Sequence, residues 1–138
     1  MKQTILLGFF LMIGSLTYSQ IYVQGGVGLA KQGNIGGDLA LGYSMGKTTI
    51  SSGYFAMLNP EQPVFLNVKV GQKLTDALHL YGGFVRIQRS SVLKQTNTNS
   101  WIAGIEYNTK KFQKRRFYYS ANYVPSYFFV CIGMKFNY

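Results

Sequence analysis

The sequence has 138 residues, a formal net charge of +10 and a single cysteine. This length suits one domain, and one cysteine excludes an intrachain disulfide framework. Charged residues make up 13% of the chain, about half their share in ordinary soluble domains, whereas aromatic residues reach 16%. Such a composition is poorly suited to a chain that faces water on all sides, and it also lacks the Gly and Pro bias of a disordered polymer.

The first 19 residues have the pattern of a secretory signal peptide. Lys2 provides the positive region, 5–16 form a short apolar run, and Thr17-Tyr18-Ser19 places small residues before a cleavage point at Gln20. The apolar run is shorter than the roughly 20 residues of a spanning helix, which makes an uncleaved anchor the weaker alternative. We therefore predict a signal peptide over 1–19 and one exported domain over 20–138.

The exported part divides into eight segments of strand length, separated by turn-prone residues. Each is close to the roughly 9–11 residues that a tilted strand needs to cross a bilayer. The segments cover 20–30, 36–45, 48–58, 63–73, 77–88, 100–109, 115–124 and 127–138. Gly46-Lys47 lies between two of them without the glycine spacing of a phosphate-binding loop, so we interpret it as a hairpin turn.

Apolar residues alternate with polar or small ones along these segments. The last segment is the clearest case, because Phe128, Val130, Ile132 and Met134 alternate with Phe129, Cys131, Gly133 and Lys135. Successive side chains of a strand point to opposite faces, so this pattern predicts one apolar and one polar or small face per strand. The fifth segment is ambiguous: Gly82-Gly83 is compatible with a bulge, and neither His79 nor Arg86 is assigned to a face.

Two features favour a barrel whose apolar face points outward to lipid. The opposite faces are rich in Gly, Ala, Ser and Asn, which suit the narrow interior of an eight-stranded barrel. Aromatic residues gather near strand ends, as in the interfacial girdles of membrane barrels. They are Tyr22, Tyr43, Tyr107, Phe117, Tyr118, Tyr119, Tyr127 and Phe128. The alternative is a secreted soluble β-barrel or β-sandwich that uses the same rings as its core and binds a ligand.

The end of the sequence, CIGMKFNY, resembles the terminal β-signal of outer-membrane barrel proteins. Gly133, Phe136 and Tyr138 match the glycine and the two aromatic positions of that signal, and Cys131 departs from its polar position. With this terminus, 20–138 resembles the small outer-membrane barrels of the OmpA/OmpX type, without a peptidoglycan-binding domain. The resemblance implies an all-β, eight-stranded antiparallel up-and-down transmembrane β-barrel in the bacterial outer membrane, assembled by the barrel assembly machinery.

An even number of strands places both termini on one side of the membrane, which we predict to be the periplasm. The turns after the second, fourth and sixth segments then face the periplasm. The polar stretch Arg89–Asn99 becomes the longest external loop.

Charged residues on the polar faces would project into the lumen. They are Asp38, Lys69, Glu106 and Lys135. Unpaired charges in a narrow interior are costly, so we expect opposite charges to pair and to block the lumen. The sequence predicts no cofactor, and no group of residues has metal-ligand spacing. His79 stands without a neighbouring nucleophile or acid of a known motif, which leaves a lipid-modifying enzyme only as an alternative to a non-enzymatic role in envelope structure or surface contact.

The densest run of charge is formed by cations near 110–116. It contains Lys110, Lys111, Lys114, Arg115 and Arg116. An exported protein meets anionic lipid or lipopolysaccharide phosphate, not nucleic acid, so these side chains are candidates to contact phosphate groups of outer-membrane lipids. A solvated turn is the alternative. The sequence does not indicate an oligomeric state.

Overall fold

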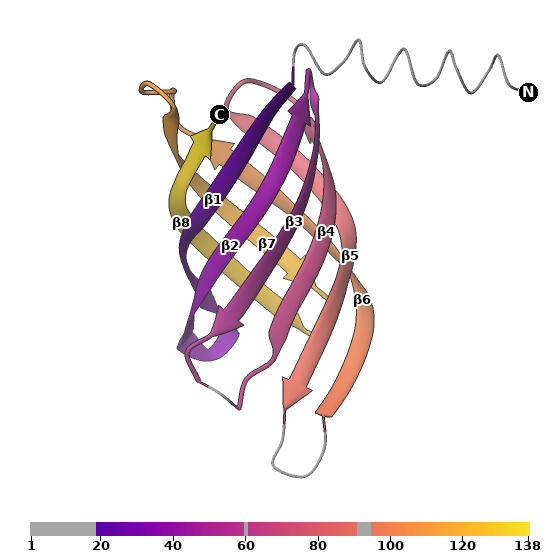
Figure 1. The fold of residues 1–138 in the computed structure, drawn as a ribbon. Helices are drawn as coiled ribbons and strands as arrows, with labels where there is room; N and C mark the ends of the chain where they lie inside the picture. Colours follow the sequence, from indigo (N-terminus) through magenta and orange to yellow (C-terminus); the bar gives the residue numbers. More distant parts are fainter. Residues whose placement is uncertain (1–18, 60, 91–94) are drawn as a thin grey trace, which may run out of the picture.

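The computed structural model describes residues 19–59, 61–90 and 95–138. Within these ranges eight antiparallel strands each pair with the next, and the last pairs with the first, so the sheet closes into an up-and-down barrel (Figure 1). The strands are β1 (Ser19–Ala30), β2 (Asn34–Met45), β3 (Thr48–Met57), β4 (Val64–Lys73), β5 (Leu78–Ser90), β6 (Gln95–Asn108), β7 (Arg115–Val124) and β8 (Tyr127–Asn137). A 3-10 turn, η1 (Lys31–Gly33), joins β1 to β2.

β1 begins and β8 ends at the same end of the barrel, at the top of Figure 1. We call this the terminal end and the opposite one the far end. The β2–β3, β4–β5 and β6–β7 connections lie at the terminal end, as the even strand count requires. The predicted signal peptide over 1–19 lies outside the described residues except for Ser19, which already pairs with Met45 in the β1–β2 ladder.

The predicted segments and the observed strands agree closely except at β5 and β6. We expected Arg89–Asn99 to be a loop, but the ladder continues through Arg86↔Asn99 and Arg89↔Thr96 as far as Ser90↔Gln95, and the rest of the predicted loop, 91–94, lies outside the described residues. Polar residues do not prevent strand pairing here, because β-branched threonines favour extended backbone and the partner strand satisfies the peptide groups. The bulge considered at Gly82-Gly83 is also absent, since the register runs on evenly from Gly71↔Tyr81 to Lys69↔Gly83.

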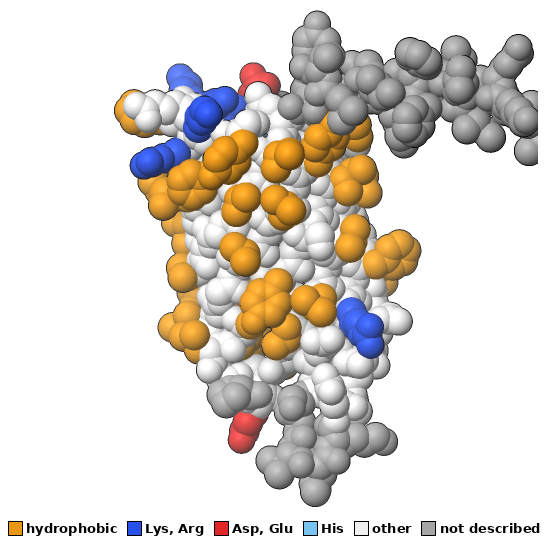
Figure 2. Space-filling view, viewed as in Figure 1, with side chains coloured by type: hydrophobic (Ala, Val, Ile, Leu, Met, Phe, Trp, Pro, Cys, Tyr) orange, Lys and Arg blue, Asp and Glu red, His pale blue; other side chains and the backbone are white. Residues whose placement is uncertain are grey.

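The outward face of most strands is apolar, whereas the inward face carries polar and small residues together with aromatic and aliphatic ones. In β4, for example, Phe65, Asn67 and Lys69 are buried, whereas Leu66 and Val68 are exposed. Hydrophobic side chains are spread over the outer wall between the two ends (Figure 2). A soluble barrel would show the reverse arrangement. Alternation by itself did not show whether the apolar face points inward or outward, and the fold shows that it points outward.

The structure also shows which side chains of the fifth segment face the lumen and which face outward. His79, Val85 and Ile87 of β5 are buried in the lumen, whereas Phe84 is 80% exposed on the outer wall. Arg86 lies on the same outer face and is exposed near the far end. Among the described residues no helix is both long and apolar enough to cross a membrane.

Candidate functional site

Aromatic rings close the lumen toward the far end. Phe55 and Phe129 stack with their ring centroids 4.5 Å apart, and Phe65 lies 5.6 Å from Phe129. Tyr127 meets Phe65 edge-on at 5.0 Å. Phe55 and Phe65 have no exposed surface at all. This group of four, here called the aromatic plug, comes from β3, β4 and β8 and packs ring against ring.

Three tyrosines fill the lumen between the aromatic plug and the terminal end, and each lies against a glycine on the neighbouring strand. Tyr22 pairs with Gly42, Tyr81 with Gly104 and Tyr118 with Gly133. A Cβ atom at any of these glycines would collide with the facing tyrosine ring or with backbone. The glycines therefore provide the space that the rings occupy.

The positions of three tyrosines correct a prediction. Tyr22, Tyr118 and Tyr127 were expected in the interfacial girdle, but Tyr22 and Tyr118 are 6% and 0% exposed inside the barrel, and Tyr127 packs against Phe65 in the aromatic plug. Their place in the alternation could have shown this, because Tyr118 lies between outward-facing Phe117 and Tyr119. Proximity to a strand end is a weaker guide than the two-residue period, which fixes the face of every side chain.

Polar interactions connect the interior tyrosines to the first predicted lumen charge. Asp38 accepts hydrogen bonds from Tyr118 Oη at 2.6 Å and from Gln24 Nε2 at 3.2 Å. Tyr81 Oη donates to Asn122 Oδ1 at 2.6 Å, and Lys69 Nζ lies 4.5 Å from the Tyr81 ring centroid. Among the described residues, Lys69 thus lies over an aromatic face and has no ion-pair partner within 4.0 Å.

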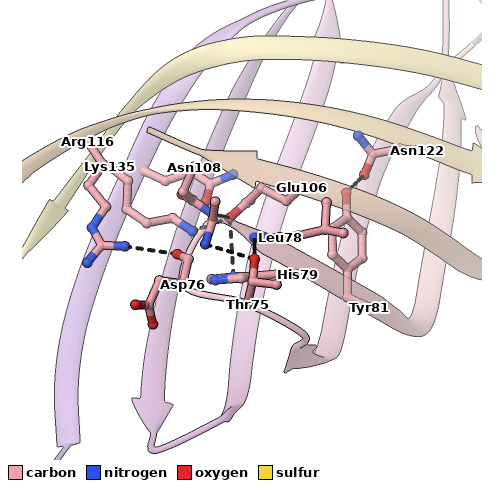
Figure 3. A network of polar contacts seen from close by, with 12 residues as sticks. Thr75, Asp76, Leu78, His79, Tyr81, Glu106, Asn108, Arg116, Asn122 and Lys135 are labelled. Carbon is pink, nitrogen blue, oxygen red and sulfur yellow. Dashed lines mark hydrogen bonds and ion pairs between the residues drawn. The ribbon is translucent and has the colours of Figure 1, made fainter. Parts of the chain in front are cut away.

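The other two predicted lumen charges meet near the terminal end, where Figure 3 shows the cluster from close by. Lys135 Nζ forms an ion pair with Glu106, and Asn108 Nδ2 donates to the same carboxylate at 2.9 Å. His79 Nδ1 lies 3.8 Å from Glu106 Oε1. Glu106 and Lys135 are 5% and 6% exposed, so each compensates a charge that would be costly to bury alone.

Little free volume remains among these side chains. Two cavities in the lumen near the terminal end measure about 30 and 20 Å³. A cavity of roughly 10–15 Å³ holds one water molecule, so these spaces admit isolated waters and no continuous column. Within the described residues, no group of His, Cys, Asp and Glu side chains could hold a metal ion.

The five cations of 110–116 do not share one surface. Lys110, Lys111 and Lys114 are exposed in the β6–β7 connection, which protrudes at the terminal end (Figure 1). Arg115 already belongs to β7, with its guanidinium carbon 5.8 Å from the outward-facing Phe136 ring. Arg116 is on the opposite face of the strand and donates to the backbone oxygen of Asp76 at the mouth of the lumen. We call Lys110, Lys111, Lys114 and Arg115 the basic hairpin, because only these four face outward.

The predicted assembly signal lies along the β1–β8 seam. Gly133 pairs with Gly26 and Phe136 with Val23, and the backbone nitrogen of Tyr138 donates to Ile21 oxygen at 2.8 Å. A Cβ atom at Gly133 would come within 2.5 Å of the Gly26 Cα, so only glycine permits this close approach of the two strands. Glycine at this position has a packing role independent of recognition by assembly machinery.

No family model and no curated protein matches the sequence, whereas solved structures share its fold. A de novo designed transmembrane β-barrel is 18% identical and has a TM-score of 0.59, covering 86% of this chain and 95% of the other. The N-terminal β-barrel domain of Pseudomonas aeruginosa OprF is 12% identical with a TM-score of 0.57 (87% and 97% covered). Ail of Yersinia pestis, solved with the heparin analogue sucrose octasulfate, is 12% identical with a TM-score of 0.53 (87% and 97%).

The chain has the fold of a small eight-stranded transmembrane β-barrel. This confirms the predicted fold class and the resemblance to barrels of the OmpA/OmpX type. The barrel is similar to its neighbours over most of their length, yet at these identities the likeness extends to the fold and not to individual site residues.

Proposed function

We propose that the chain is a closed, non-enzymatic barrel of the bacterial outer membrane that serves envelope structure or surface contact. The observation that supports this most directly is the filled lumen. The aromatic plug, the interior tyrosines and the Glu106–Lys135 pair follow one another from the far end to the terminal end. Eight strands leave an interior only wide enough for side chains, so transport through the barrel would require these groups to move apart.

Planar-bilayer recording tests the closed state. We expect the refolded barrel to produce no stable conductance steps, because its interior rings and ion pair fill the described part of the lumen and the cavities near the terminal end measure about 30 and 20 Å³. A porin refolded in the same detergent provides the positive control for insertion. Reproducible steps from this chain, of a size typical of porins, would replace the structural role with a transport role.

We further propose that the basic hairpin contacts phosphate groups of membrane lipids at the terminal end. Phe112, 75% exposed, lies among its lysines, and Arg115 is next to the outward-facing Phe136 ring. Cations beside exposed aromatic rings suit the lipid headgroup region, where the rings enter the acyl boundary and the charges meet phosphate. With the termini in the periplasm, these lipids belong to the inner leaflet of the outer membrane.

Replacing Lys110, Lys111 and Lys114 with glutamine tests this contact. Each cation near an anionic surface contributes about 1 kcal/mol, so the triple variant should bind phosphatidylglycerol roughly a hundredfold more weakly. Phosphatidylglycerol retained from mixed nanodiscs can be counted by native mass spectrometry. A control replaces Lys31, Arg86 and Arg89 with glutamine, which removes the same charge from the far end. Equal losses in both variants would contradict a specific role for the basic hairpin.

A further inference from the structure

The larger of the two lumen cavities, here the mouth cavity, has an unusual lining. It measures about 30 Å³ and lies where the lumen meets the terminal end. Its charged and imidazole-bearing wall residues are Lys73, His79, Arg116 and Lys135, and Asn108 is among its neutral ones. No carboxylate side chain is part of this wall, although Glu106 lies just beyond it on the neighbouring cavity.

The positive charge of the wall exceeds what the surrounding carboxylates neutralise. Lys135 is paired with Glu106. Arg116 donates instead to the neutral backbone oxygen of Asp76 at 3.3 Å, as Figure 3 shows. Among the residues that the structure describes, Lys73 has no ion pair within 4.0 Å. Among the described residues, two cations of the mouth therefore lack an ion-pair partner within 4.0 Å, and the Asp76 carboxylate acts on Lys73 only from a longer distance.

Two buried nitrogens of the same wall also lack a hydrogen-bond partner. They are His79 Nε2 and Arg116 Nε, and His79 is only 7% exposed. A buried donor without a partner costs about 1–3 kcal/mol, so native structures seldom leave one unsatisfied. Water alone would satisfy these nitrogens but would leave the charge excess unchanged. An anion removes both costs.

We infer that the mouth cavity binds a small inorganic anion of the size of chloride. The volume admits about two water-sized bodies, so a halide fits together with one water molecule that can donate to the unpaired Asn108 Oδ1. Arg116 and Lys73 supply the compensating charge, and His79 Nε2 contributes a hydrogen bond when it carries the ring proton. The site goes beyond the proposed structural role and is independent of any lipid contact by the basic hairpin.

Anomalous diffraction on crystals of the unmodified protein grown in sodium bromide tests the site directly. A bromide peak between Arg116 and Lys73 is the expected result. Density that refines as water alone, with no anomalous signal, would overturn the proposal. This measurement needs no variant and is therefore unaffected by any folding defect.

Thermal unfolding in neutral detergent micelles gives a second readout. A ligand that binds only the folded state raises the unfolding midpoint, so sodium chloride should raise it by about 5 °C over sodium gluconate of equal ionic strength, because gluconate is too large for the cavity. Arg116→Gln and Lys73→Gln should each abolish this difference. The double variant Lys110→Gln and Lys111→Gln, which removes charge from the same end but not from the cavity wall, should keep it. Equal midpoints in the two salts for the unmodified protein, or loss of the difference in the control, would overturn the assignment.

Discussion

At the scale of single residues, the lumen is built from complementary sizes on neighbouring strands. Tyr118 can lie flat in the interior because Gly133 and Gly26 have no side chain beneath it. The Tyr118 hydroxyl of β7 then reaches Asp38 of β2 by passing over these two glycines, which lie on the intervening strands β8 and β1. Aromatic rings therefore occupy the space beside the small residues of the polar faces. This is why little free volume remains in the lumen.

The buried ion pair provides the residue-scale prediction. Glu106→Gln leaves Lys135 charged without its carboxylate, and breaking a buried pair in this way costs about 3–5 kcal/mol. Urea unfolding of the barrel in phosphatidylcholine vesicles should show a loss of stability of this size. The double variant Glu106→Gln and Lys135→Met should recover much of it, since it removes the uncompensated charge. A double variant as unstable as the single one would show that the pair is not the source of the loss.

At the scale of elements, β8 is the strand on which closure depends. It pairs with β7 along one edge and with β1 along the other. A barrel that lacks this seam exposes two open edges, and the peptide groups of an open edge cannot be satisfied in lipid. The terminal residues thus have a structural function at the seam as well as the expected function as an assembly signal.

Deletion of Phe136–Tyr138 tests the terminal strand. The truncated chain loses the Val23↔Phe136 pairing and the Tyr138–Ile21 hydrogen bond, so we expect assembly to fail and the protein to be degraded. Immunoblots of membrane fractions measure its level. Phe112→Ser, which removes an exposed aromatic residue of the β6–β7 connection without changing the seam, is the matched control. Wild-type levels of the truncated form would contradict both roles of the terminus.

At the scale of the whole molecule, the distribution of side chains is that of a membrane protein. Large apolar residues such as Leu41, Val70 and Ile132 are 58%, 53% and 45% exposed on the outer wall, whereas charged Glu106 and Lys135 are buried. Water would penalise such an outer surface, because monomeric soluble proteins rarely expose large continuous apolar patches. Lipid around the wall removes this penalty.

Fractionation of the expressing cell provides the whole-molecule prediction. We expect the protein in the outer-membrane fraction, resistant to extraction by carbonate and released by detergent, because its apolar wall needs a lipid or detergent surround. A porin serves as the control for the outer-membrane fraction, and a soluble periplasmic protein serves as the control for the soluble fraction. Recovery in the soluble periplasm or in the culture medium would contradict a membrane barrel and favour a secreted β protein.

The sequence by itself determined the strand pattern and the two faces of most strands. Alternation is a local property, since a period of two places Phe129, Cys131 and Lys135 on one face whatever the strand contacts. The positions of most turns followed in the same way from residues such as Gly46, whose φ of 56° suits the β2–β3 turn. The sequence did not predict where β6 begins. Its polar first residues were expected to be loop, but they pair with β5 and extend the strand.

Only the tertiary structure decided which side chains meet. Tyr118 and Asp38 are 80 residues apart, and the sequence separation of Lys135 and Glu106 is 29, so no local pattern predicts these pairs. The register of each ladder and the closure of β8 on β1 determine them, because a shift by one residue would move every side chain to the opposite face. Alternation places the neighbouring cations Arg115 and Arg116 on opposite faces of β7, and the closed barrel decides what those faces meet: Arg116 lies at the mouth of the lumen and Arg115 beside the outward-facing Phe136.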